Sequence, residues 1–255
     1  MNHFSTLFVY TIILFIIIHS IYPFYFSHIF NIFFNKGSNE SLDVIIAHYN
    51  EDLDWVDKIL PENCRIYIYT KSDQKPICKR SYIHEYLPNV GREGHTYLHH
   101  ILKYYDHEKS DNILFLPGTS NVWYKNIILN AQLSQIGKYD FCGHLIQIND
   151  FTKICDEMCI DFIKQHGYYS IYKNPGDLHH YLTNTDYSSM EIFNKKFQIQ
   201  PHYYSQWGMN LIKSKLIHNR SKMYYEDLYN VMNKEKNSLE GHFLERAWYS
   251  IFTQD

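Results

Sequence analysis

The chain has 255 residues, which is enough for one large domain or two small ones. Its formal net charge is −3, from 24 basic and 27 acidic residues, which argues against a nucleic-acid-binding protein and against a polybasic membrane patch. Aromatic residues make up 17% of the chain and include 24 tyrosines, so a single tyrosine carries little weight as a site residue.

The N-terminal segment differs in kind from the rest of the chain. The run from Leu7 to Phe26 carries no formal charge, and the first Lys or Arg is Lys36. About 20 apolar residues at roughly 1.5 Å each span the ~30 Å hydrocarbon core of a bilayer. Because the run lacks a basic n-region and a small-residue cleavage site, it predicts a retained signal anchor over residues 1–35. A cleaved signal peptide and a buried apolar helix are the alternatives.

This anchor predicts a single-pass membrane protein whose C-terminal domain lies in an endomembrane lumen or on a viral or host membrane. The charges that flank the anchor do not fix its orientation. The polar residues 36–41, KGSNES, form a linker, and residues 42–255 are expected to form a single α/β domain.

Five cysteines are too few and too irregularly spaced for a disulfide framework. Cys155 and Cys159 form a C-x3-C pair without a second pair, so no zinc site is expected there. A lumenal disulfide and simple burial are both compatible with this spacing.

Apolar runs typical of buried strands alternate with helical periodicity in the first half of the domain. Strands are predicted in the four-to-five-residue apolar run of residues 43–52, which ends in polar turn residues, and in residues 64–70 and 112–118. Helices are predicted in residues 53–60, 96–105 and 126–137. This alternation predicts a mostly parallel sheet covered by helices. Further along, a late strand turning into a helix is predicted at 207–217, and helices at 224–232 and 241–252. Residues 150–200 are expected to lie over the open end of the sheet as helices and loops.

Ligands of such sheets bind beyond the carboxyl ends of the strands, so the polar residues there are candidates for a site. Asn50 and Glu51 follow the first predicted strand, where an amide and an acid can bind ligand hydroxyls. The alternative is helix capping by Asn50, with the acids in the first helical turn.

Residues 87–100, LPNVGREGHTYLHH, place an arginine and a glutamate between two glycines at a predicted helix start. Gly91 and Gly94 let the backbone approach a ligand, and the helix N-terminus favours negative charge. Arg92 suits a phosphate or carboxylate, and Glu93 either holds the arginine or accepts from a sugar hydroxyl. The alternative is an Arg-Glu pair that pins a loop.

Histidines and a late glutamate complete the candidates. His95 is kept as a ligand-binding candidate, and with His99 it has the i, i+4 spacing of a metal pair. No third ligand and no H-E-x-x-H motif accompany this pair, so packing or hydrogen bonding is the preferred reading and no metal site is predicted. Glu245 lies between core-type residues, where burial raises a carboxyl pKa and makes it a candidate base. An ion pair with a basic residue is the alternative.

Several stretches taken together resemble a domain of unknown function that is widespread in fungi and in large DNA viruses. The members of that family show Y-N-E-D-x-x-W, N-x-G-R-E-x-x-T-Y-L, F-L-Q-G and E-R-x-W motifs. The chain matches these in order between about Asp43 and Phe252, and the N-x-G-R-E-x-x-T-Y-L block is the specific one. Pro117 stands in place of the family's glutamine, so no role is carried over to that side chain.

The layout of this family is similar to that of A-type glycosyltransferases, which have a nucleotide-binding half followed by an acceptor-binding half with a late catalytic carboxylate. The resemblance implies that Asn50 and Glu51 lie near the nucleotide and that Arg92 and Glu93 lie near the pyrophosphate or sugar. It also implies that Glu245 is the catalytic base.

The residues after the third predicted strand, GTSN at 118–121, stand where a metal-dependent transferase carries acids. A transferase of this kind is therefore expected to stabilise the leaving diphosphate with a cation such as Arg92 or Lys213 in place of a divalent metal. The resemblance thus implies a glycosyltransferase that moves a sugar from a nucleotide donor to a glycan or glycoprotein hydroxyl. The alternative is a non-catalytic, membrane-anchored domain that binds a carbohydrate or a partner.

Overall fold

The computed structural model describes residues 40–107, 110–147, 187–200, 203–234, 236 and 238–254. The predicted anchor over residues 1–35, the cysteines 155 and 159, and most of residues 150–200 lie outside these ranges. Within the described ranges, no helix combines the length and the apolar character needed to cross a membrane.

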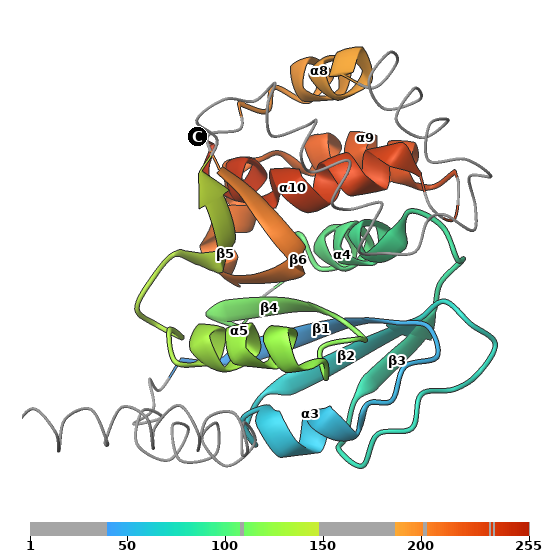
Figure 1. Cartoon of the computed structure of the whole chain (residues 1–255), viewed down its shortest axis with the longest axis vertical. Helices are drawn as coiled ribbons and strands as arrows, with labels where there is room; N and C mark the ends of the chain where they lie inside the picture. Colours follow the sequence, from blue (N-terminus) through green and yellow to red (C-terminus); the bar gives the residue numbers. More distant parts are fainter. Residues whose placement is uncertain are drawn as a thin grey trace, which may run out of the picture.

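Among the described residues, six strands form one mixed sheet in the order β3-β2-β1-β4-β6-β5 (Figure 1). The strands are β1 (Leu42–His48), β2 (Arg65–Thr70), β3 (Ile83–Tyr86), β4 (Asn112–Pro117), β5 (Phe141–Gln147) and β6 (Tyr203–Lys213). Strands β1 to β4 are parallel, whereas β6 pairs antiparallel with both β4 and β5. The α/β fold expected from the sequence is therefore confirmed.

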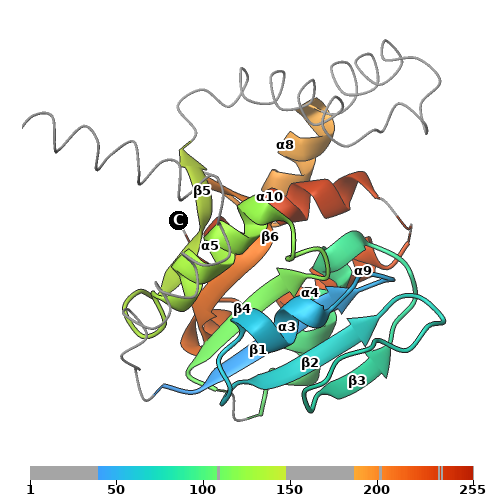
Figure 2. The same cartoon turned by 60° about the horizontal axis from the view of Figure 1, so that its bottom comes forward.

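Helices cover both faces of this sheet (Figures 1 and 2). One face carries α4 (Arg92–Lys103), α8 (Tyr187–Lys196), η3 (Ser214–Asn219), α9 (Lys222–Met232) and α10 (Leu239–Thr253). The other face carries α3 (Asp54–Ile59) and α5 (Trp123–Leu133). The fold thus has a helix–sheet–helix sandwich with two separate apolar cores.

Alternation along the central strands supplies both cores. Odd-numbered residues such as Ile45, Ile113 and Phe115 face α4 and α10, while even-numbered residues such as Ile46 and Leu114 face α3 and α5. Because parallel strands are buried on both faces, they show as continuous apolar runs in the sequence.

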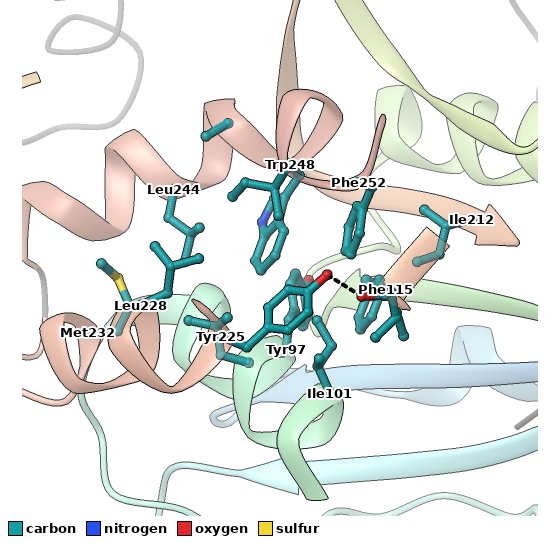
Figure 3. Close-up of a cluster of buried hydrophobic side chains, with 14 of the residues drawn as sticks. Tyr97, Ile101, Phe115, Ile212, Tyr225, Leu228, Met232, Leu244, Trp248 and Phe252 are labelled. Carbon is teal, nitrogen blue, oxygen red and sulfur yellow. Dashed lines mark hydrogen bonds between the residues drawn. The ribbon is translucent and has the colours of Figure 1, made fainter. Parts of the chain in front are cut away.

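Aromatic packing fixes α4 and α10 against β4 (Figure 3). The ring of Phe115 stacks on Trp248 and on Phe252 of α10, with centroid distances of 6.4 and 6.1 Å and interplanar angles of 6° and 9°. Tyr97 of α4 contacts the same phenylalanine at 4.9 Å. These contacts bring the start of α4 beside the middle of α10, which is where the candidate site forms.

The strand order reverses at β1. From β1 the chain continues to β2 and β3 on one side, and then crosses to β4 on the other side of β1. Such a switch point leaves a crevice beyond the carboxyl ends of the two strands, and ligands of open α/β sheets bind there. The loops that follow β1 and β4 are therefore placed to form a site.

Gln132 of α5 joins this helix to the two strands at the β5 edge. Its side-chain amide donates to the carbonyl oxygens of Cys142 and Met209, both at 2.9 Å, and the residue is 1% exposed. Gln132→Leu removes both donors from a buried position. We expect the free energy of unfolding to fall by about 1–3 kcal/mol, measured by urea denaturation. Gln135→Leu, at a partly exposed position just after α5, is the control, and equal midpoints for the two variants would contradict the prediction.

Candidate functional site

The turn before α4 is strained and tightly packed. Gly91 and Arg92 have φ angles of 57° and 51°, in the left-handed region that non-glycine residues rarely adopt. A Cβ atom on Gly91 would lie 2.5 Å from the carbonyl oxygen of Met232 in α9. The glycine that the sequence places here is therefore required by the turn and by the neighbouring helix.

The side chain of Lys71, which follows β2, binds the backbone of this turn. Its ammonium donates to the carbonyl oxygen of Val90 at 2.5 Å and to that of Arg92. Burial lowers the pKa of Lys71 to about 7, although the carboxylate of Glu93 opposes the shift. These two hydrogen bonds hold the backbone on both sides of Gly91, and they therefore fix the direction in which the side chain of Arg92 points.

Arg92 joins the start of α4 to α10. Its Nη2 lies 3.3 Å from Oε2 of Glu245, its Nε lies 3.5 Å from Oε2 of Glu93, and its Nη1 lies 2.9 Å from Nε2 of His242. The side chains of the arginine and the two glutamates are 19%, 10% and 14% exposed, respectively. We call Arg92, Glu93, His242 and Glu245 the arginine–carboxylate cluster.

The two carboxylates of this cluster have opposite pKa shifts. Burial raises the pKa of Glu245, and the neighbouring charge of Glu93 raises it further, against the effect of Arg92. Burial also works against the charge of Glu93, but Arg92, a backbone hydrogen bond and Lys71 outweigh it and lower its pKa. The cluster therefore contains one carboxylate held in its charged form and one that takes up a proton readily.

The loops after β1 and β4 meet beside the cluster. A Cβ atom on Gly118 would lie 2.5 Å from Oε2 of Glu51, so a glycine is needed for the carboxylate to sit against the β4–α5 loop. In that loop Thr119 accepts a hydrogen bond from the ammonium of Lys125 at 2.6 Å. Burial lowers the pKa of Lys125, while Glu51 and both carboxylates of the cluster act in the opposite direction. Charges from β1, α4, α5 and α10 thus interact at this edge of the sheet.

Strand β6 contributes an irregular segment that the sequence did not reveal. Trp207 and Gly208 have φ angles of 65° and 64°, within a stretch where the pairing of β6 with β5 shifts register. A Cβ atom on Gly208 would lie 3.0 Å from Cγ of Glu93, and the carbonyl of Gly208 accepts a hydrogen bond from Tyr97 at 2.9 Å. The bulge therefore brings the β6 backbone against the arginine–carboxylate cluster.

Of the residues singled out in the sequence, Arg92, Glu93 and Glu245 come together, with Glu51 nearby. Asn50 is exposed beyond the end of β1. The alternative of capping by Asn50 does not hold, because the backbone N–H of Asp54 at the start of α3 donates to the carboxylate of Asp52 at 2.8 Å. The acids of that alternative, Asp54 and Asp57, do lie in the first turn of α3.

Lys213 lies at the opposite end of the sheet. It pairs with Asn112 at the amino end of β4, and its ammonium binds the carboxylate of Glu40. The structure therefore does not bring Lys213 together with Arg92, because β6 runs antiparallel to β4.

His95 is a core residue and does not face the cluster. It is fully buried and stacks on Tyr229 at a centroid distance of 4.6 Å, and burial lowers its pKa to about 3. His99 has a different partner, Glu85, with 3.1 Å between Nε2 and Oε1. His95 therefore packs in the core, and His99 forms a hydrogen bond with a carboxylate. In the part of the chain that the structure describes, no three His, Cys, Asp or Glu side chains are grouped to hold a metal.

Residues 44–139 match a family model described as "Protein of unknown function (DUF3431)". The matched range begins in β1, includes the strained turn and α4, and ends after α5, so it does not include Glu245. No curated protein and no solved structure matches the chain. A DUF3431 domain, whose function is unknown, is thus found at residues 44–139.

Proposed function

We propose that the chain is a glycosyltransferase that moves a sugar from a nucleotide donor to an acceptor hydroxyl, with Glu245 as the catalytic base. The observation that carries the proposal is the buried carboxylate pair, in which Glu245 has a raised pKa and Glu93 a lowered one beside Arg92. Pairs of titratable groups whose pKa values are pushed apart are typical of acid–base sites. The switch-point edge of the sheet, where ligands of this fold class bind, supports the same proposal.

In the proposed reaction, Oε2 of Glu245 takes the proton of the acceptor hydroxyl. The hydroxyl oxygen forms a bond to the anomeric carbon of the donor as the bond from that carbon to the diphosphate breaks. The electron pair of the broken bond leaves with the diphosphate. Lys125, whose ammonium binds the neutral hydroxyl of Thr119, supplies positive charge to the leaving group.

In this proposal Arg92 does not bind the diphosphate, which is the role expected for it from the sequence. Its guanidinium is engaged by Glu93, Glu245 and His242, so it orients the carboxylates and does not grip the diphosphate. Glu51, at the end of β1, is the group we assign to a ribose hydroxyl of the donor.

The second candidate is a non-catalytic carbohydrate-binding domain. The observation that favours it is the same engagement of Arg92, because an arginine whose three nitrogens contact protein groups is typical of a structural ion-pair network. The two candidates differ in one requirement, which is the binding of a nucleotide.

The test is a thermal-shift panel on the full-length protein with UDP, GDP, CMP and their sugar conjugates, each with and without Mn²⁺. A ligand at about 100 times its dissociation constant stabilises the native state by about 2.7 kcal/mol, which gives a clear rise in Tm. We expect a selective rise that is lost in Lys125→Ala and kept in Lys213→Ala, whose lysine lies at the opposite end of the sheet.

With the conjugate that binds, release of the nucleoside diphosphate in the presence of acceptor sugars measures turnover. Glu245→Gln keeps the size of the side chain and removes the base, so we expect kcat to fall by a factor of about 10²–10⁴ with the nucleotide-induced Tm rise retained. A flat panel from a well-folded protein contradicts the transferase and favours the binding domain.

A further inference from the structure

Three aromatic side chains from two distant segments form a strip beside the site. Trp123 and Tyr124 lie at the start of α5, and Trp207 lies in the bulge of β6. The ring centroids of Trp123 and Tyr124 are 5.7 Å apart at an interplanar angle of 89°, and those of Tyr124 and Trp207 are 5.1 Å apart at 53°. We call these three residues the aromatic strip.

The outer end of the strip is open to solvent. Trp123 is 72% exposed, and Ile127, one turn further along α5, is 50% exposed. Tryptophan is highly buried on average in folded proteins, so a largely exposed one next to further apolar surface is typical of a binding site.

The inner end of the strip is held by strained backbone. Trp207 is a bulky residue with a φ of 65°, a conformation that costs on the order of 1–3 kcal/mol and persists only where surrounding contacts impose it. The next residue, Gly208, is fixed by the buried hydroxyl of Tyr97. Strain of this kind gathers at ligand sites, and here it presents an indole ring to Tyr124.

The carboxylate next to the inner end of the strip favours an uncharged ligand. Gly208, which follows Trp207, lies against the side chain of Glu93. A carboxylate accepts hydrogen bonds from ligand hydroxyls and repels a phosphate. Aromatic faces bind the apolar C–H face of a sugar, while the hydroxyls at its rim remain for polar groups.

We infer that the aromatic strip binds a neutral pyranose ring of the acceptor, with the apolar face of the ring on the aromatic side chains and its hydroxyls toward the inner end of the strip, where Glu93 lies. The assignment of this ring to the acceptor rests on the proposed function. The binding of a pyranose at the strip does not depend on the proposed function.

The chain has four tryptophans, which makes the inference directly testable. Trp55 and Trp248 are 4% and 1% exposed, so they serve as internal controls for the two tryptophans of the strip. The full-length protein is labelled with 5-fluorotryptophan, and its four ¹⁹F signals are assigned from single Trp→Phe variants. It is then titrated with methyl β-D-glucopyranoside, methyl β-D-galactopyranoside, methyl α-D-mannopyranoside and the corresponding disaccharides.

We expect at least one glycoside to shift the signals of Trp123 and Trp207 in a saturable manner, and to leave Trp55 and Trp248 unchanged. Trp123→Ala should weaken this binding about tenfold, measured on the Trp207 signal. Met223→Ala, which removes exposed apolar surface from α9 on the other face of the sheet, should leave the Kd unchanged.

The outcomes separate this inference from the proposed function. Glycoside binding at the strip without any nucleotide-induced Tm rise supports the strip and contradicts the transferase. A nucleotide-induced Tm rise with no glycoside effect on the Trp123 signal contradicts sugar binding at the aromatic strip and remains consistent with the proposed transferase. Shifts of Trp123 and Trp207 by UDP alone also overturn the inference, because the strip then binds the base of the donor.

Discussion

Gly91→Ala is expected to lower the free energy of unfolding by about 2–5 kcal/mol. An alanine at a φ of 57° adopts a left-handed conformation that costs roughly 1–2 kcal/mol. Its Cβ would also lie 2.5 Å from the carbonyl oxygen of Met232 and 2.8 Å from Cβ of His95. Neither atom is the end of a flexible chain, so α4 and α9 must separate, and overpacking of this kind costs about 1–3 kcal/mol more.

Urea denaturation of the full-length protein measures the effect, and Gly241→Ala is the matched control. Gly241 lies in the first turn of α10, has no left-handed φ, and would place its Cβ no closer than 3.3 Å to a neighbouring atom. Alanine is favoured over glycine in a helix by up to about 1 kcal/mol, so this variant should remain within about 1 kcal/mol of the wild type. Equal urea midpoints for the two variants would mean that α9 moves away from the added methyl group at little cost, which would contradict the tight packing described above.

The sequence predicted the central strands better than the edges of the sheet. β1, β2 and β4 are buried on both faces, and each leaves a run of apolar residues in the sequence. β3 and β5 were not predicted, because both are edge strands with partly exposed residues and neither has such a run. β5 is also interrupted at Gly143, where its register with β6 shifts.

The direction of β6 explains why Lys213 lies away from the candidate site and why Trp207 lies beside it. In a parallel strand, Lys213 would lie at the carboxyl edge of the sheet together with Glu51. Because β6 is antiparallel, its start faces that edge and its end lies beside Asn112, so Trp207 and not Lys213 comes to the site. Hydrophobic periodicity gives the existence of a strand but does not give its direction.

The meeting of Arg92 with Glu245 depends on tertiary packing across more than half of the chain. Glycines on both sides of the Arg-Glu pair and apolar neighbours around Glu245 marked each segment separately in the sequence. His95 has the same local context as Arg92 but points into α9, where it stacks on Tyr229. The aromatic core determines which side of α4 contacts α9 and which end contacts α10. No local sequence pattern predicts this orientation.

Arg92→Met is expected to destabilise the protein by about 3–5 kcal/mol near pH 8, because it leaves two buried carboxylates without their shared cation. The loss should shrink as the pH falls. Glu245 already has a folded-state pKa above its ordinary value, and removal of the guanidinium raises it further. Stability from such a group is fully present below the unfolded pKa and is lost as the pH rises through the folded one.

Glu93 contributes to the pH dependence of the stability difference with the same sign as Glu245. In the wild type its folded pKa is lowered, although burial acts against this, because Arg92 and other donors stabilise the charge. That contribution is present above the ordinary carboxyl pKa and is lost as the pH falls through the folded value. Without Arg92 this stabilising contribution of Glu93 is missing at neutral pH. The difference in the free energy of unfolding between the wild type and the variant should therefore widen from pH 4 to pH 8.

The measurement is urea denaturation of both proteins at intervals between pH 4 and pH 8, with the double variant Arg92→Met/Glu245→Leu as the control. If the cluster is held together by the shared cation, removing one carboxylate as well should restore much of the stability at pH 8 and flatten the pH dependence. A single variant whose destabilisation is equal at pH 4 and pH 8 would show that Arg92 acts through packing alone. In that case Glu245 is not a carboxylate tuned by Arg92, and its proposed role as a base loses its physical support.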